Sequence, residues 1–311
     1  MSIKLLLTLF VLFTISKLSF AQSNPQNVAI WNQNNTLIVG LCDMFDGEAC
    51  VAKLSLPGLN YLQGNISSQL STLNYNTNVL TLTAKDSSNN LLILSVDCNK
   101  WKVVGKNAVD KFTNYLGFSS DQSSSNKIFA SKQDDQALYV LALNPFSASI
   151  QIFDWVFGLY RGSVFDPINQ NYFVAHKNNT GLFITIYDIN FNIVADKLIS
   201  FTGASVVDQP LKLTYCPVSQ TIVAIVQLYY IPGRNQFALA KLDWAYGTFD
   251  VTSMVGVQND IFLFNVADSA SDIVYTFAKP NAKDTFIYTW DLTEGTQTQY
   301  TAYDKPLLAA F

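Results

Sequence analysis

Residues 163–199 read SVFDPINQNYFVAHKNNTGLFITIYDINFNIVADKLI, and the pattern in this stretch decides the fold. Turns rich in Asn, Asp, Gly and Pro divide it into four short runs: Ser163–Asp166, Tyr172–His176, Leu182–Asp188 and Ile193–Ile199. Val, Ile, Phe, Tyr and Thr between such turns are typical of β-strands joined as hairpins. No segment of the chain keeps a helical period of about 3.6 residues, so the sequence predicts an all-β protein with almost no helix.

The same pattern recurs along the chain, and two landmarks give its period. A polar turn ends, at steps of 43, 48, 44, 50 and 51 residues, at Asn35, Asn78, Asn126, Gln170, Gln220 and Ser271. A strand-like run ends, at steps of 42, 47, 44, 55 and 48 residues, at Ser55, Asp97, Asn144, Asp188, Asp243 and Asp291. The fifth repeat has the same four runs as the fourth: Leu211–Tyr215, Thr221–Gln227, Phe237–Asp243 and Phe249–Val255. A period of about 47 residues therefore predicts six repeats of four strands each.

The third run of a repeat indicates how the repeats pack. Leu91–Leu94 and Phe183–Tyr187 are apolar on both faces, as in strands that are covered from both sides. Blades of a β-propeller provide such cover, because each four-stranded sheet packs between two others. The chain resembles a six-bladed β-propeller over nearly all of Gln22–Phe311, although the repeated signatures of WD40 and kelch propellers are absent. Seven blades and tandem β-sandwiches are the alternatives, and Lys305–Phe311 is interpreted as a strand that closes the ring on the first blade.

The first 21 residues are typical of a secretory signal peptide. A lysine precedes the apolar run Leu5–Ile15, and Ala21 ends a short segment of small residues. The run is too short to cross a bilayer, which takes about 20 apolar residues. We therefore expect cleavage after Ala21 and secretion of Gln22–Phe311 as one extracellular domain with no stable membrane span. That domain has 17 basic and 23 acidic residues, which argues against a nucleic-acid partner.

Asparagines and cysteines support the secretory interpretation. Three Asn-X-Ser/Thr sequons are expected glycosylation sites in a secreted chain: Asn34, Asn65 and Asn178. Cys42 and Cys50 flank a predicted hairpin between the second and third strands of the first repeat, within reach of a disulfide. Cys98 and Cys216 fall in the second and fifth repeats, on opposite sides of the predicted ring, so we expect them not to pair with each other.

The propeller resemblance implies two loop faces, of which the one after the second and fourth strands usually meets ligands. A lysine follows the second predicted strand in four repeats: Lys85, Lys132, Lys177 and Lys279. The fifth repeat has a longer loop there with three candidate contact residues: Tyr229, Tyr230 and Arg234. Aromatic and arginine side chains in an exposed loop are typical interface anchors. Lysine is also an ordinary solvated residue at a strand end, so these positions are candidates for binding and nothing more specific.

Aspartates before the first strand of each repeat give a second hypothesis. They are Asp110, Asp208, Asp260 and Asp304, and Arg161 takes the matching place in the fourth repeat. Together with Asn259, the last three would supply the oxygen atoms that Ca²⁺ prefers. Such a site would suit a metal-dependent hydrolase or lactonase, although aspartate is also frequent in turns for reasons of local hydrogen bonding.

The sequence offers no other catalytic chemistry. His176 is the single histidine, and it ends a predicted strand beside a sequon, so no catalytic role is expected for it. One histidine without a Cys-X-X-Cys pair does not match the common zinc sites, and no Gly-rich phosphate loop is present. We therefore expect a non-catalytic binding module without a cofactor, whose ligand is an extracellular protein or glycan in cell–cell contact, matrix or secreted signalling. A Ca²⁺-dependent hydrolase is the alternative.

Overall fold

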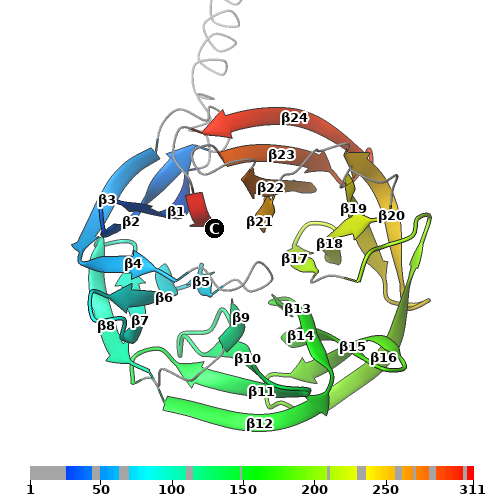
Figure 1. The fold of residues 1–311 in the computed structure, drawn as a ribbon, viewed down its shortest axis with the longest axis horizontal. Helices are drawn as coiled ribbons and strands as arrows, with labels where there is room; N and C mark the ends of the chain where they lie inside the picture. The colour runs from blue at the N-terminus through cyan, green and yellow to red at the C-terminus, as the bar shows by residue number, and fades with distance from the viewer. Residues whose placement is uncertain are drawn as a thin grey trace, which may run out of the picture.

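The fold is a ring of β-sheets around a common centre (Figure 1). The computed structural model describes residues 26–43, 50–62, 70–109, 115–147, 149–208, 211–229, 236–255, 261–268, 271–279, 285–303 and 307–311. The regular elements in these ranges are strands, numbered β1 to β25, so the predicted all-β class is confirmed for them. None of these residues belongs to a helix that could cross a membrane.

Three sheets in the described part of the chain are antiparallel arrays of four strands that run in order from the centre of the ring to its rim (Figure 1). One contains β25 (Leu307–Ala310), β1 (Gln26–Gln33), β2 (Thr36–Asp43) and β3 (Cys50–Pro57). The next contains β9 (Tyr115–Ser120), β10 (Ile128–Asp134), β11 (Ala137–Asn144) and β12 (Ser149–Phe157). The third contains β21 (Ile261–Ala267), β22 (Ile273–Lys279), β23 (Thr285–Asp291) and β24 (Thr296–Tyr303).

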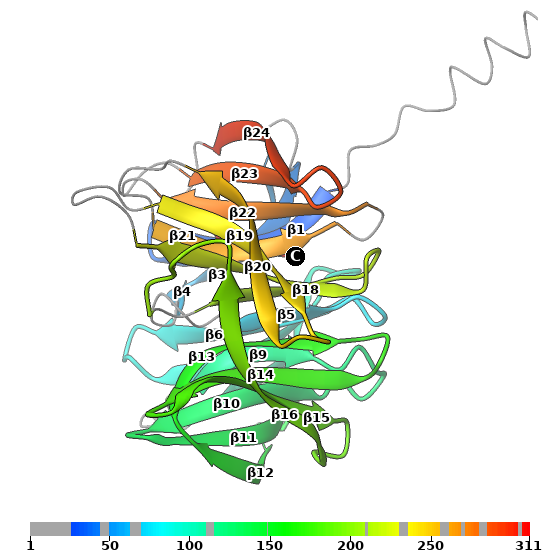
Figure 2. The same cartoon turned by 90° about the vertical axis from the view of Figure 1, so that its right-hand side faces the viewer.

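An eight-stranded sheet joins two more such arrays at the rim. One array is β13 (Leu159–Asp166), β14 (Asn171–Asn178), β15 (Gly181–Asp188) and β16 (Ile193–Thr202). The other is β17 (Lys212–Cys216), β18 (Thr221–Leu228), β19 (Gln236–Asp243) and β20 (Thr248–Val255). Their outer strands β16 and β20 pair in parallel, with Ser200 opposite Thr248, on the side of the ring that faces the viewer in Figure 2. The strands predicted for the fourth and fifth repeats are thus confirmed to within a few residues.

The remaining sheet has an inner strand in two pieces. β4 (Leu59–Tyr61) and β5 (Ser71–Asn74) pair with opposite ends of β6 (Val79–Asp86), which is followed outward by β7 (Leu91–Asp97) and β8 (Lys102–Ala108). This sheet therefore has the same centre-to-rim order as the others, with an interrupted innermost position.

Pairing between distant parts of the chain closes the ring. β25 runs antiparallel to β1, with Ala310 opposite Ala29, and the backbone N–H of Phe311 donates to the carbonyl of Val28 at 2.9 Å. The predicted closing strand is therefore confirmed. The prediction for the first repeat is wrong by one strand, because β25 supplies its innermost strand and β1 to β3 are the other three.

Most of the landmark residues have definite turn geometry, whereas Ser55 lies within the strand β3. Left-handed backbone angles, with φ between 50° and 56°, occur at Asn35, Asn78, Asn126, Gln170 and Gln220. Side-chain oxygens accept a hydrogen bond from the backbone N–H two residues later, at 2.8–3.0 Å, at Asp97, Asn144, Asp188, Asp243 and Asp291. Asn and Asp favour such turns because their short side chains bond the local backbone. The periodicity of the sequence is thus the periodicity of its turns.

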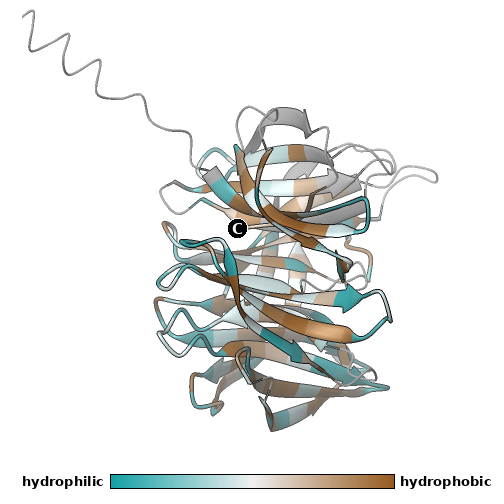
Figure 3. Ribbon diagram, turned by 90° about the vertical axis from the view of Figure 1, so that its left-hand side faces the viewer, coloured by the Kyte–Doolittle hydropathy of each residue, from teal (hydrophilic) through white to brown (hydrophobic). Residues whose placement is uncertain are grey.

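Apolar side chains fill the space between neighbouring arrays. On β14, Phe173 and Ala175 pack towards β17–β20, whereas Tyr172 and Val174 pack towards β9–β12. Hydrophobic residues consequently run along the strands while hydrophilic residues gather at the turns (Figure 3). Each array is a blade buried on both faces, as Phe183–Tyr187 predicts, and the radial arrangement is that of a β-propeller. The alternative of tandem sandwiches is wrong, because the sheets stand around a centre instead of stacking in pairs (Figure 1).

Candidate functional site

On the loop face that is predicted to meet ligands, predicted site residues come together between the blades β13–β16 and β17–β20. Arg161 lies in β13, Lys177 near the end of β14, and Asp208 in the loop that follows β16. The structure thus brings three predicted residues together from three separate segments. Lys177 belongs to the strand and not to the loop after it, because β14 extends further than predicted.

Asp208 is held by two cations. Arg161 Nε donates to Oδ1 at 3.1 Å, and Lys177 Nζ donates to Oδ2 at 2.7 Å. Arg161 is only 13% exposed, whereas the side chains of Lys177 and Asp208 are 37% and 47% exposed. Partial burial raises the pKa of Asp208, but the hydrogen bonds and charges of Lys177 and Arg161 outweigh it and hold the pKa below its usual range. The group keeps one net positive charge on a surface that water can reach.

The end of β18 lies beside the same loop. The backbone N–H of Val207 donates to the carbonyl of Gln227 at 2.7 Å, and the N–H of Tyr229 donates to the carbonyl of Ser205 at 2.8 Å. These bonds attach the loop after β16 to the neighbouring blade. Tyr229 is 65% exposed, so an aromatic side chain stands out from the surface that Asp208 belongs to. We call Arg161, Lys177, Asp208 and Tyr229 the face cluster.

The other predicted lysines stand on other blades. Lys85 and Lys132 lie within β6 and β10, and Lys279 is the last residue of β22, so these strands also extend further than predicted. Lys85 is exposed and Lys132 is half-buried. The lysine series is therefore distributed around the ring, and Lys177 is the member that the structure joins to Asp208.

Several predicted site residues lie outside the described residues: Asn65, Asp110, Tyr230, Arg234, Asn259, Asp260 and Asp304. Of the predicted calcium ligands, Asp208 alone is described, and both of its carboxylate oxygens accept hydrogen bonds from cations. The role of Asp208 as a metal ligand stays a prediction, since each carboxylate oxygen has more than one lone pair. Within the described ranges, no group of three or more His, Cys, Asp or Glu side chains could hold a metal ion.

His176 is part of a buried chain of hydrogen bonds. Its Nε2 lies 2.9 Å from Thr185 Oγ1, which donates to Asp196 Oδ1 at 2.7 Å. Because the hydroxyl proton goes to the carboxylate, Nε2 must donate to Thr185 and Nδ1 carries no proton. Nδ1 is buried without a hydrogen-bond partner. Burial lowers the pKa of His176, and the charge of Asp196 opposes that shift only in part.

Sequence reasoning missed Lys212. It lies in the innermost strand β17, where burial lowers the pKa of its amine to about 7. Its side chain is half-buried, so part of it still reaches solvent. The surrounding letters, Leu211-Lys212-Leu213-Thr214-Tyr215, show a single lysine in an apolar strand and give no signal of an altered pKa.

The described sequons lie in turns. Asn34 is exposed in the turn between β1 and β2. Asn178 ends β14, and its Oδ1 accepts hydrogen bonds from the backbone N–H and the hydroxyl of Thr180, at 2.8 and 2.6 Å. These hydrogen bonds use the side-chain oxygen of Asn178, whereas a glycan would be attached to its side-chain nitrogen. Both positions are compatible with the predicted modification.

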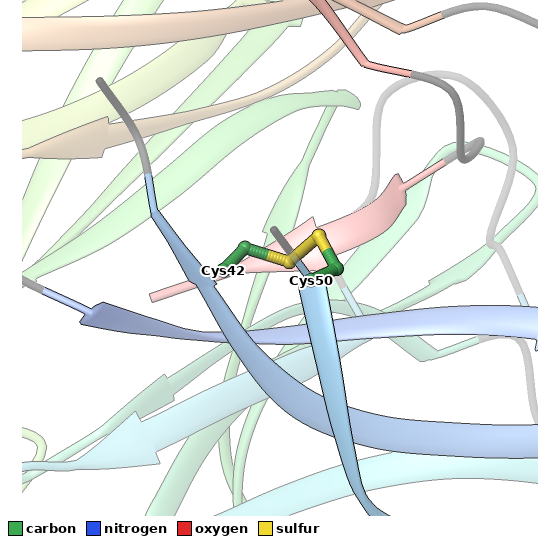
Figure 4. Close-up of a disulfide and its surroundings, with 2 residues drawn as sticks. All are labelled: Cys42 and Cys50. Atoms are coloured by element: carbon green, nitrogen blue, oxygen red, sulfur yellow. A yellow bond between two sulfur atoms is a disulfide. The ribbon is translucent and has the colours of Figure 1, made fainter. Parts of the chain in front are cut away.

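The cysteines pair as predicted, but the disulfide joins different strands of the blade from those expected. Cys42 and Cys50 form a disulfide, with their Cα atoms 4.2 Å apart (Figure 4). The bond joins β2 to β3, the third and fourth strands of the blade, because the first repeat is shifted by one strand. It therefore lies on the face opposite to the one predicted. Cys98 and Cys216 are buried thiols that do not pair with each other, in blades on opposite sides of the ring (Figure 1).

Comparison with known proteins shows the fold alone. No protein-family model matches the chain, and no curated protein sequence matches it. TolB from Acinetobacter baumannii is similar in structure, with a TM-score of 0.60 and 9% identity over 91% of this chain and 66% of TolB. A functionally unknown protein from Desulfotomaculum acetoxidans has a TM-score of 0.49 at 10% identity, over 91% of this chain and 83% of its own. A chain of the mitotic checkpoint complex has a TM-score of 0.46 at 11% identity, over 80% and 84%.

The likeness to TolB fits the ring seen here. The chain spans just under two thirds of the TolB chain, and the alignment covers nearly all of this one. At such low identity no activity or partner is transferred, because unrelated functions share one fold. The chain has the fold of a β-propeller.

Proposed function

We propose that this chain is a secreted, glycosylated, six-bladed β-propeller that binds another extracellular protein through the face cluster. The observation that carries the proposal is the exposed Tyr229, which is hydrogen-bonded through its backbone to Ser205, in the same loop as the ion-paired Asp208. Aromatic and arginine side chains with a polar surround are typical of interface anchors. Hydrogen bonds fix the loop before any partner arrives, so binding costs little ordering entropy there.

The charges of the cluster indicate the kind of partner. Arg161 and Lys177 share one carboxylate, which leaves one net positive charge beside an aromatic ring. Such a surface suits an acidic patch with an apolar centre on a folded protein. Electrostatic contacts of this kind raise the association rate and weaken with salt. Binding should therefore weaken as ionic strength rises.

A binding role is supported over catalysis by what the predicted reactive groups contact. Both oxygens of Asp208 accept hydrogen bonds from cations, which balance its charge. His176 is almost fully buried and its Nε2 bonds Thr185, so its imidazole is out of reach of a substrate on the surface. The Ca²⁺-dependent hydrolase stays a prediction for Asp208, Asn259, Asp260 and Asp304.

The remaining parts of the proposal come from the sequence and the blade pattern. The signal peptide and the sequons support secretion and glycosylation. Six blades follow if the two halves of the eight-stranded sheet count separately, because each half has the centre-to-rim order of the other sheets. Amino-terminal sequencing of the secreted protein should begin at Gln22, and glycosidase treatment should lower its apparent mass.

The binding proposal is tested by capture from extracellular medium with immobilised protein. Tyr229→Ala should lose the proteins that wild type retains at low salt, because it removes the aromatic anchor. Tyr246→Ala is the matched control, since Tyr246 is 82% exposed in the turn between β19 and β20 at the opposite end of the strands. Capture that is equal for both variants would overturn the proposal. A melting temperature that rises with Ca²⁺ and falls with chelator would favour the hydrolase instead.

A further inference from the structure

The outer strand of one blade exposes an unusual number of large apolar side chains. On β12, the exposed fractions are 43% for Ile150, 56% for Ile152, 37% for Phe153, 59% for Trp155 and 49% for Phe157. We call these five residues the rim stripe. β12 is the outermost strand of its sheet and pairs with β11 alone among the described strands (Figure 1).

Four other rim strands are protected in ways that β12 is not. β8 carries the exposed lysines Lys102 and Lys106, and β3 carries the exposed Lys53. β16 and β20 pair with each other over Ser200–Thr202. Charged edges and covered edges are the usual means by which sheets avoid association. β12 has neither, so its stripe is a candidate contact surface.

Four of the five side chains lie on one face of β12. Ile150, Ile152, Trp155 and Phe157 are opposite alternate residues of β11, from Leu143 to Ala137. The fifth, Phe153, stacks on Phe191 of the next blade, with ring centroids 3.7 Å apart. Scattered apolar residues on a surface need no explanation, but an apolar row along one face of an edge strand is a candidate interface.

The area is enough for weak association between two like surfaces. With ~200 Å² for a whole aromatic side chain, Trp155 and Phe157 leave roughly 220 Å² open. The two isoleucines bring this face to about 330 Å², so two copies would bury about 650 Å² from these side chains alone. The exposed backbone edge of β12 would bring the contact towards the ~1,000 Å² at which stable interfaces begin, so we expect a weak dimer.

We propose that the rim stripe is a twofold interface between two copies of this chain. A twofold contact sets a surface against itself, so any net charge on it would repel. The only charged residue of β12 is Asp154, which lies opposite Val140 on the other face of the strand, where Tyr187 donates to its Oδ2 at 3.0 Å. The face that carries Ile150, Ile152, Trp155 and Phe157 is thus apolar, like the buried core of homodimer interfaces. A partner recognised by opposite charge would find no charge here to match.

The test is the solution mass of the secreted full chain, measured by sedimentation and light scattering from about 0.1 to 100 μM. Wild type should approach twice the chain mass as concentration rises. Trp155→Lys and Ile152→Lys should each raise the dissociation constant at least about tenfold, because a lysine would meet its own copy in the interface. Both residues are more than half exposed, so these variants should unfold at the wild-type temperature.

Val51→Lys is the matched control, since Val51 is 48% exposed on the rim strand β3, and it should dimerise like wild type. Tyr229→Ala should also dimerise normally, which separates this interface from the face cluster. A wild type that stays monomeric over the whole range would overturn the proposal. So would a dimer that Trp155→Lys and Ile152→Lys leave intact, or a monomer that binds neutral lipid vesicles through the stripe.

Discussion

Removing the disulfide between Cys42 and Cys50 should lower the free energy of unfolding by an amount that the loop length sets. The two residues are 8 apart in sequence, so the bond closes a short loop. The chain-entropy relation gives about 2.5 kcal/mol at 25 °C for a loop of that length. In a domain of this size, that loss corresponds to a fall in melting temperature of about 4 °C.

Two perturbations separate the cross-link from its packing. Reduction of wild type removes the bond and keeps both sulfur atoms, so it should cost about 2.5 kcal/mol. The double variant Cys42→Ala/Cys50→Ala also loses the sulfur of Cys42, which is fully buried, and should cost roughly 1 kcal/mol more. Urea unfolding followed by tryptophan fluorescence, with and without reductant, measures both losses.

The double variant is its own control, because it holds no disulfide among these residues and reductant should leave its unfolding curve unchanged. A loss of less than about 0.5 kcal/mol on reduction of wild type would contradict the chain-entropy estimate for this loop. Reductant that destabilises the double variant as much as wild type would show that the loss does not come from the disulfide.

Two further predictions concern buried groups. Because burial lowers the folded pKa of His176, the unfolded chain binds a proton first, near its ordinary pKa of about 6.5, and stability should fall as pH drops below that value. Urea unfolding at about pH 7.5 and pH 5 should show a smaller fall in His176→Gln than in wild type, and equal falls would contradict the assignment. Burial raises the pKa of Cys98 to about 11 and that of Cys216 to about 12, so neither thiol should react with a chromogenic disulfide reagent until the protein is unfolded. Rapid labelling of the folded protein would show that one of them is accessible.

The sequence predicts the local part of this fold well. Turn residues such as Asn78 and Asp188 carry their own geometry, because a left-handed backbone angle or a side-chain bond to the local backbone depends on a few neighbouring residues. Their spacing therefore predicts the strands, the period and the propeller resemblance. The strand that closes the ring is also recognisable, as Lys305–Phe311 repeats the letters of an innermost strand.

Non-local pairing is what the sequence does not reveal. The register of the first repeat depends on β25, which lies at the other end of the described chain from β1. The parallel pairing of β16 with β20 depends on the distance between two rims, which no local pattern encodes. The exposure of the rim stripe is not predictable from the sequence either, because Ser149–Phe157 is apolar enough to be taken for a buried strand.

In the face cluster, too, the sequence marks single residues but not their contacts. Arg161, Lys177 and Asp208 are each marked by their place in a repeat, yet the pattern assigns them to separate roles as cations and as metal ligands. Only the structure shows that the cations engage the carboxylate. Residues at equivalent repeat positions meet across blades, so repeat alignment identifies candidates but not their partners.

The pairing of β1 with β25 delays the completion of the first blade during synthesis, because the chain is made from its amino end. β1 is among the first strands to emerge, and its inner edge waits for Leu307–Ala310, which follow on the order of tens of seconds later at ordinary synthesis rates. Ile30 and Trp31, fully or almost fully buried in the finished ring, lack that neighbour during the whole interval. A premature stop codon anywhere before Leu307 leaves the same gap. Nonsense variants should therefore share one fate, retention by chaperones that bind an open edge, however much of the chain they keep.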